Sequence, residues 1–275
     1  MPLSAEAEFQ RLVRIMATLR SPEGCPWDRE QTFASLGQFV LEEAYEVVDA
    51  IERNDIRALC EEIGDHIFEG VFLAQIAEDE GRFTVADSLE SVSDKLVRRH
   101  PHVFREDGRV HDAESKERAP SADAALSKWD AQKAAEKGAL GQSASALGEL
   151  PHGLPALLKA YKLAKRAAGV GFDWANASDV VAKIEEEVTE LRQTLEQEPS
   201  NAARAEEEMG DLLFAIANLS RKLGIEPEAA LRKANQKFTR RFEAMESAIK
   251  SSGRQLETMK LDELEAHWQR IKLER

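Results

Sequence analysis

The sequence has few cysteines, few aromatic residues and no excess of positive charge. Its two cysteines, Cys25 and Cys60, are too few for a disulfide scaffold and stand in no zinc-binding pattern, which favours a reducing cytoplasm. Aromatic residues make up only 6% of the chain, so a packed core must be mostly aliphatic. With 37 Lys and Arg against 51 Asp and Glu, the net charge is −14, which argues against a nucleic-acid partner.

Long apolar runs are also missing. The N-terminus lacks the apolar core of a signal peptide, and no run approaches the roughly 18 apolar residues of a membrane span. The sequence therefore predicts a cytoplasmic protein without a membrane partner. The 43% of hydrophobic residues in this 275-residue chain still suffice for packed cores in one or two domains.

An acidic pattern occurs twice in the chain. Each copy has two pairs of acids spaced i, i+3, which are Glu43, Glu46, Glu62 and Asp65 in the first copy and Glu187, Glu190, Glu208 and Asp211 in the second. Residues with this spacing share one face of a helix, so two antiparallel helices would bring the four carboxylates of a copy together. Oxygen-only ligands favour a hard cation, Mg²⁺ with Mn²⁺ as the alternative.

The order of motifs around these acids repeats as well. A single Glu-x-x-Glu on a surface helix is usually solvated charge. In both copies, however, the acids are followed by a basic K-x-x-R-R cluster, at residues 95–99 and 237–241, and then by Trp129 or Trp268. Random surface charge would not repeat in this order, so the chain is predicted to contain two related modules.

Most segments with a clear period are helical. Apolar spacing predicts helices over residues 5–20, 32–53, 56–80 and 202–223. In the second of these, Glu43 lies only about 20° outside the apolar stripe, so we expect it to be partly buried, whereas Glu42 and Asp49 point to solvent. Gly64 and Gly210, each directly before an acidic ligand, suggest close packing because glycine disfavours helices.

The acidic helix of the second copy is less clear from periodicity. Its predicted apolar stripe consists of Val181, Ile184, Val188, Leu191 and Leu195. Glu185 and Glu187 flank this stripe on opposite sides, so periodicity does not choose between them. The choice of Glu187 depends on its match to the first copy.

The domain organisation follows from the repeat. We expect modules at residues 1–105 and 152–275, separated by a mostly exposed linker at 106–151 with a short helix near Trp129. Each module offers about four helices with apolar faces on more than one side. The fold class is therefore all-α, with four-helix modules whose bundles are completed in a homodimer.

Several motifs resemble those of the MazG family over nearly the full length, apart from parts of the linker. They are GCPWD at 24–28, LEEAYE at 41–46, RRHPHVF at 98–104, VGFDW at 170–174, EEEMGDLLF at 206–214 and NQKFTRRF at 235–242. The resemblance implies two tandem MazG-type modules and an intertwined dimer. It also implies Mg²⁺-dependent hydrolysis of nucleoside triphosphates to monophosphate and pyrophosphate, in the service of nucleotide-pool house-cleaning.

The resemblance further assigns roles to individual residues. It places catalysis in the second module, where the metal ligands are Glu187, Glu190, Glu208 and Asp211. It places Lys237, Arg241 and Trp268 at the nucleotide, together with Arg204, which stands where the family often has lysine. The first copy would then form a second, weaker site.

Two other functions remain open on the sequence alone. A di-iron carboxylate oxidoreductase also uses Glu-rich helices, but it needs Glu-x-x-His pairs, and the residue three before His66 is Ile63. The other is a helical dimerisation or regulatory scaffold, whose acids would be ordinary surface charge.

Overall fold

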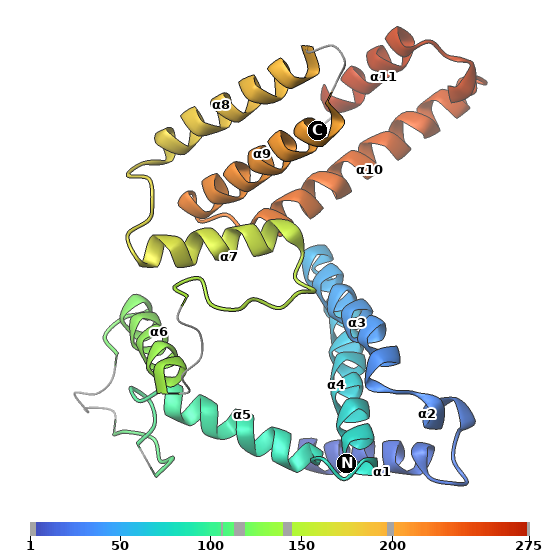
Figure 1. The fold of residues 1–275 in the computed structure, drawn as a ribbon. Coiled ribbons are helices and arrows are strands. Elements are labelled where there is room, and N and C mark those ends of the chain that lie inside the picture. Colours follow the sequence, from blue (N-terminus) through green and yellow to red (C-terminus); the bar gives the residue numbers. More distant parts are fainter. Residues whose placement is uncertain (1–3, 106, 113–118, 140–144, 197–200, 274–275) are drawn as a thin grey trace. The chain divides into compact units, whose positions relative to one another are not determined.

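The computed structural model describes residues 4–105, 107–112, 119–139, 145–196 and 201–273, and its regular elements in these ranges are all helical (Figure 1). The predicted all-α class is confirmed. The chain forms two compact units, residues 1–140 and 141–275. This division differs from the sequence boundaries at 105 and 151, because helix α6 (Ala122–Ala139) spans 18 residues and packs against α5 of the first unit.

The first unit is built around an antiparallel helix pair. Its helices are α1 (Ala5–Arg20), α2 (Pro26–Glu30), α3 (Phe33–Arg53), α4 (Ile56–Asp79), α5 (Val85–Arg99) and α6. Helix α3 ends at Asn54, whose φ of 55° is left-handed, and α4 begins at once because the Asp55 side chain accepts a hydrogen bond from the Ala58 amide. This short turn packs α3 and α4 side by side along their lengths (Figure 1).

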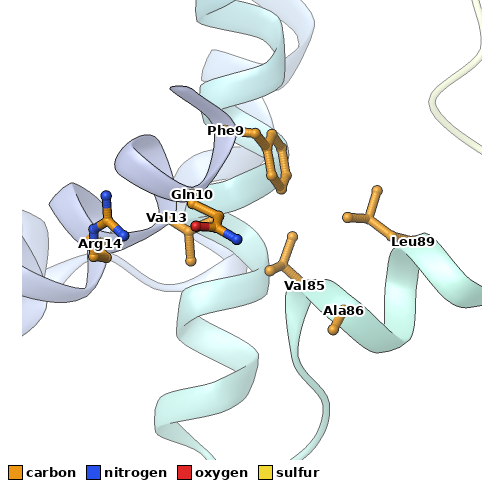
Figure 2. Close-up of a pocket in the computed structure, with 7 residues that line it drawn as sticks. All are labelled: Phe9, Gln10, Val13, Arg14, Val85, Ala86 and Leu89. Carbon is orange, nitrogen blue, oxygen red and sulfur yellow. The ribbon is translucent and has the colours of Figure 1, made fainter. Parts of the chain in front are cut away.

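The core of the first unit lies where α1, α3 and α4 meet. It consists of Met16, Leu36, Val71, Phe72 and Ile76, all at most 3% exposed. Beside it, α1 and α5 enclose an apolar pocket lined by Phe9, Gln10, Val13, Arg14, Val85, Ala86 and Leu89 (Figure 2). None of the acids of the repeated pattern lines this pocket, and one arginine among mainly apolar side chains does not suit a polyphosphate.

The second unit repeats the antiparallel pair. Its helices are α7 (Ala156–Gly169), α8 (Ala177–Glu196), α9 (Ala202–Lys222), α10 (Pro227–Ser251) and α11 (Leu261–Leu273), with a 3₁₀ turn at Leu256–Thr258. Helices α8 and α9 pack side by side, α7 lies against α9, and α11 folds back along α10 (Figure 1). The Asn201 side chain caps α9 by accepting from the Arg204 amide.

Helix α8 buries a face other than the predicted stripe. Val180, Glu187 and Thr194 are its buried residues, whereas Val181 and Val188 are about two-fifths exposed, at 41% and 38%. The two faces are adjacent on the helix. The buried face carries Glu187 and Thr194, which are polar and therefore do not contribute to an apolar period. The predicted stripe is therefore only partly confirmed: Ile184 and Leu191 are half-buried, whereas Val181, Val188 and Leu195 are exposed.

Gly64 and Gly210 do not occupy close helix contacts within the chain. A Cβ placed at either glycine would meet no heavy atom of the described residues within 4 Å. The predicted close packing is wrong for the chain taken alone.

None of the described helices combines the length and the apolarity needed to cross a membrane.

A small network of ion pairs joins the segment before α8 to the end of α9. Asp173, in the segment before α8, accepts from Arg221 Nη2 at 2.5 Å and from Lys222 Nζ at 2.8 Å, both at the end of α9. The Lys222 hydrogen bond, followed by that of Arg221, holds the pKa of Asp173 below its usual range. These contacts tie the α7–α8 connection to α9, the helix that carries Glu208.

The first prediction concerns the pH dependence of this network. Because the folded pKa of Asp173 is lowered, its stabilisation is present above the unfolded pKa of about 3.9 and is lost as pH falls through the folded value. Asp173→Asn should lower the free energy of unfolding by about 1 kcal/mol at pH 7, and the difference from wild type should shrink below about pH 4. Urea denaturation across pH measures this. Asp94→Asn, at an exposed acid on α5, is the control and should cost little at any pH.

Candidate functional site

Three acids of the second copy converge between α8 and α9. Glu187 and Glu190 come from α8 and Glu208 from α9, and carboxylate oxygens of all three lie within 4.8 Å of one another. Glu187 and Glu208 are buried, at 4% and 8% exposure. Glu185 is exposed, so Glu187 is the acid that faces the site. The burial of these carboxylates contradicts a scaffold whose acids are merely surface charge.

Two basic side chains partly neutralise this group. Lys183 Nζ lies 2.7 Å from Glu187 Oε1, and Arg204 Nε lies 3.4 Å from Glu208 Oε1. Hydrogen bonds to Glu187 and then to Glu186 raise the pKa of Lys183, so it stays charged. The sequence analysis missed Lys183, although its i, i+4 spacing to Glu187 could have indicated it.

The second carboxylate oxygen of Glu187 bears on whether these residues would fit a metal ion. Glu187 Oε2 is buried and has no hydrogen-bond partner. The pKa of Glu190 is raised by burial and then by the charge of Glu208. Buried, mutually repelling carboxylates with an unused oxygen suit a divalent cation, and an all-oxygen donor set fits Mg²⁺ or Mn²⁺.

Asp211 stands apart from the three converged acids. It lies on α9, one turn beyond Glu208, but it is exposed and does not belong to the group within 4.8 Å. Three of the four predicted metal ligands therefore converge, and the fourth, Asp211, lies at the edge of their group.

Three of the four predicted nucleotide contacts, Lys237, Arg241 and Trp268, lie on α10 and α11, whereas Arg204 lies on α9. Trp268 of α11 packs on Phe238 with ring centroids 5.3 Å apart, and Phe238 stacks on Phe242 at 5.9 Å. Lys237 and Arg241 precede Phe238 and Phe242 in the sequence of α10. In the part of the chain that the structure describes, no hydrogen bond or ion pair joins either cation to the acids of α8 and α9. The cluster presents apolar rings and positive charge together.

The first copy also brings acids together. Glu43 of α3 and Glu62 and Asp65 of α4 offer carboxylate oxygens within 4.8 Å of one another. Glu43 is partly buried, as its place beside the apolar stripe predicted. Burial, and then the neighbouring Glu46, raises the pKa of Glu43; burial and then a hydrogen bond with Glu46 raise that of Glu62.

A fifth acid of the first unit lies deeper. Glu69, one turn after Asp65 on α4, is 6% exposed, and its Oε2 has no hydrogen-bond partner. Burial, and then the charges of Glu43 and Asp65, raise its pKa. The matching position in the second unit is Ala215.

The basic cluster of the first unit is engaged by α6. Glu136 accepts from Arg98 Nε at 2.7 Å and from Arg99 Nη2 at 2.6 Å, and Arg99 also lies over the Trp129 ring at 5.6 Å. In the second unit, among the residues the structure describes, Lys237 and Arg241 form no ion pair. The two units therefore differ in whether an acid of the same unit pairs with the arginines of the basic cluster.

Comparison with known proteins supports the repeat. The family model described as the MazG nucleotide pyrophosphohydrolase domain matches twice, at residues 31–104 and 176–245. A protein of Escherichia coli (strain K12) named nucleoside triphosphate pyrophosphohydrolase is 45% identical over 266 residues, covering 96% of this chain and 97% of its own length. Thermotoga maritima has a relative named nucleoside triphosphate pyrophosphohydrolase/pyrophosphatase MazG, 42% identical, with 96% and 95% covered.

A shorter match comes from Mycolicibacterium smegmatis. Its nucleoside triphosphate pyrophosphohydrolase is 34% identical over 161 residues, which cover 58% of this chain and 45% of that protein. Each match of the family model includes the whole acidic helix pair of one unit, α3 with α4 in the first and α8 with α9 in the second.

Proposed function

The chain belongs to the MazG nucleotide pyrophosphohydrolase family, and on this premise we propose that it hydrolyses nucleoside triphosphates to nucleoside monophosphate and pyrophosphate with a divalent cation held in its second unit. The observation that carries this proposal is the convergence of Glu187, Glu190 and Glu208. Three carboxylates alone would repel a polyphosphate. The same carboxylates with Mg²⁺ or Mn²⁺ would attract it.

The residues of the second unit have distinct roles in this proposal. Glu187, Glu190 and Glu208 would hold the cation, and Lys183, whose Nζ lies 2.7 Å from Glu187 Oε1, offsets part of their charge. A bound divalent cation offsets the charge of phosphate oxygens and lowers the pKa of a bound water. Asp211, exposed one turn from Glu208, would accept a proton from the attacking water.

The cationic and aromatic side chains would bind the substrate. Arg204 is 48% exposed at its side chain, and its 3.4 Å contact with Glu208 is long enough to yield to a phosphate oxygen. Lys237 and Arg241 lie on one face of α10 and would offset the charge of the pyrophosphate leaving group. Trp268 beside Phe238 offers an aromatic surface for the base. We propose that this hydrolysis removes unwanted nucleotides, which is a house-cleaning role.

The second unit is the catalytic one in this proposal. Its basic cluster is open to a substrate, whereas Glu136 occupies Arg98 and Arg99 in the first unit. Arg204 adds a further cation, where the first unit has Ala58. A polyphosphate would therefore meet more uncompensated positive charge in the second unit.

We also propose a homodimer, because both helix pairs leave apolar side chains exposed. In the second unit they include Val181, Val188 and Leu195 on α8 and Met209 and Leu213 on α9. Residues 181, 188 and 195 are spaced by seven and line one helix face. A second copy packed on such faces would complete the bundle and cover Gly210, whose helix surface is open.

The second prediction concerns the products. With Mg²⁺, a nucleoside triphosphate should yield monophosphate and intact pyrophosphate, and chelation by EDTA should abolish turnover. In ¹⁸O-labelled water, attack at the α-phosphorus puts the label in the monophosphate. Mass spectrometry of both products measures this, and release of single phosphate would refute the proposed reaction.

The third prediction separates the two units. Glu190→Ala or Asp211→Ala should lower kcat/KM at least about a hundredfold, which corresponds to roughly 2.7 kcal/mol of transition-state stabilisation. The matched first-unit variants, Glu46→Ala and Asp65→Ala, should cost much less. Steady-state kinetics with a thermal melt of each variant makes the comparison; inactive first-unit variants with active second-unit variants would exchange the assignment.

The fourth prediction concerns assembly. Light scattering at micromolar concentration should give twice the 30.7 kDa mass of the chain. Val188→Lys places a charge on the exposed stripe of α8 and should weaken the dimer at least about tenfold. Leu261→Lys, at a 77% exposed position that starts α11, is the control and should leave the mass unchanged. A monomeric wild type would contradict the proposal.

A further inference from the structure

A single carboxylate of α6 binds both arginines at the end of α5. Glu136 Oε1 accepts from Arg98 Nε at 2.7 Å, and Glu136 Oε2 accepts from Arg99 Nε at 2.9 Å and from Arg99 Nη2 at 2.6 Å. Both oxygens of the carboxylate are therefore engaged by guanidinium groups. Arginines bind phosphate oxygens with the same donors, so this arrangement would also suit a phosphate group.

The charges of this contact do not balance. Two guanidinium groups face one carboxylate, and Lys95, one turn before Arg99 on α5, adds a further positive charge. Among the described residues, Glu136 is the one acid that forms an ion pair with either arginine. A phosphate group carries up to two negative charges and would compensate more of this positive charge than Glu136 does.

Helix α6 is held to α5 mainly by these polar contacts. Its chief packing partner is α5, beside whose end it lies in Figure 1. The large apolar residues of α6 are Leu126, which is 56% exposed, and Trp129, whose ring lies 5.6 Å from the Arg99 guanidinium. Apolar burial therefore contributes little to this contact. The Arg98 side chain is 52% exposed, and ion pairs with exposed members are weak and screened by salt, so the contact is suited to reversible release.

The second unit has no equivalent of this cover among its described residues. There Lys237 and Arg241 form no ion pair, and Trp268 packs on Phe238. In the first unit, α6 engages two arginines of the basic cluster through Glu136, and Trp129 packs on one of them. The same order of basic and aromatic residues is thus open in one unit and occupied from within in the other.

We propose that α6 is a displaceable strap: Glu136 occupies a polyphosphate-binding site formed by Arg98 and Arg99, and a polyphosphate that binds there releases α6 from α5. The ligand is a short polyphosphate, either free pyrophosphate or the phosphate chain of a nucleotide. The arginines recognise its phosphate oxygens, and Trp129 leaves with α6. This site lies in the first unit and does not depend on hydrolysis in the second.

The fifth prediction concerns the attachment of α6. Hydrogen–deuterium exchange of the full chain, followed by mass spectrometry of peptides from residues 122–139, measures it. Glu136→Gln removes the charge that both arginines bind and should speed exchange in α6 at least about fivefold. Glu90→Gln removes the same charge from an exposed position of α5 and should change nothing. Unchanged protection of α6 in Glu136→Gln would overturn the proposal.

The same exchange measurement identifies the ligand. In EDTA, pyrophosphate or a nucleoside triphosphate added to the wild type should speed exchange in α6, whereas chloride at matched ionic strength should not. A larger response to the triphosphate would identify the nucleotide as the ligand, and an equal or larger response to pyrophosphate would identify the free anion; either supports the strap. No response to both, or an equal response to chloride, would refute it.

Competition between Glu136 and the ligand gives a second measurement. Pyrophosphate is titrated calorimetrically into a chain with Lys237→Ala and Arg241→Ala, which remove the basic cluster of the second unit. Adding Glu136→Gln should then tighten binding at least about fivefold, because the ligand no longer has to displace α6. Equal or weaker binding would contradict the strap. Neither measurement involves turnover, so failure here would leave the proposed hydrolysis untouched.

Discussion

The repulsion between carboxylates on paired antiparallel helices is the interaction on which the arrangement of charges in both units depends. In each unit, one helix hairpin brings three acids within 4.8 Å and withdraws at least one of them from water. Like charges so close are unfavourable in a partly apolar setting. Positive charge nearby would relieve this repulsion, and the two units differ in how much of it their own side chains supply.

The second unit supplies part of that charge itself. Lys183 and Arg204 stand one turn before their acidic partners on the same helices, so the fold of α8 and α9 places them without further contacts. The first unit has apolar residues at these positions and adds Glu69. The two modules thus share the helix pair that brings the acids together, but they differ in the charged residues around those acids.

The basic clusters show the same divergence at a second place. In the first unit α6 brings Glu136 to Arg98 and Arg99, whereas Lys237 and Arg241 make no ion pair among the described residues of the second unit. This difference between the basic clusters of the two units depends on one helix of the first unit, which carries Glu136. That element, α6, is an 18-residue helix in a segment whose sequence lacks a clear apolar period.

The sequence by itself determined the all-α class, the limits of α1, α3, α4 and α9, the repeat and the convergence of three acids in each copy, because these depend on local periodicity and i, i+3 spacing. The end of α3 follows from the left-handed backbone of Asn54, and the start of α4 follows from the Asp55 cap; both act locally. Only the tertiary structure decided that α8 turns Glu187 inward and Val188 outward, that Asp211 stays at the margin, and that Glu136 covers the first basic cluster. Those outcomes depend on which neighbouring helix covers a given face, and such long-range packing leaves no period in the sequence.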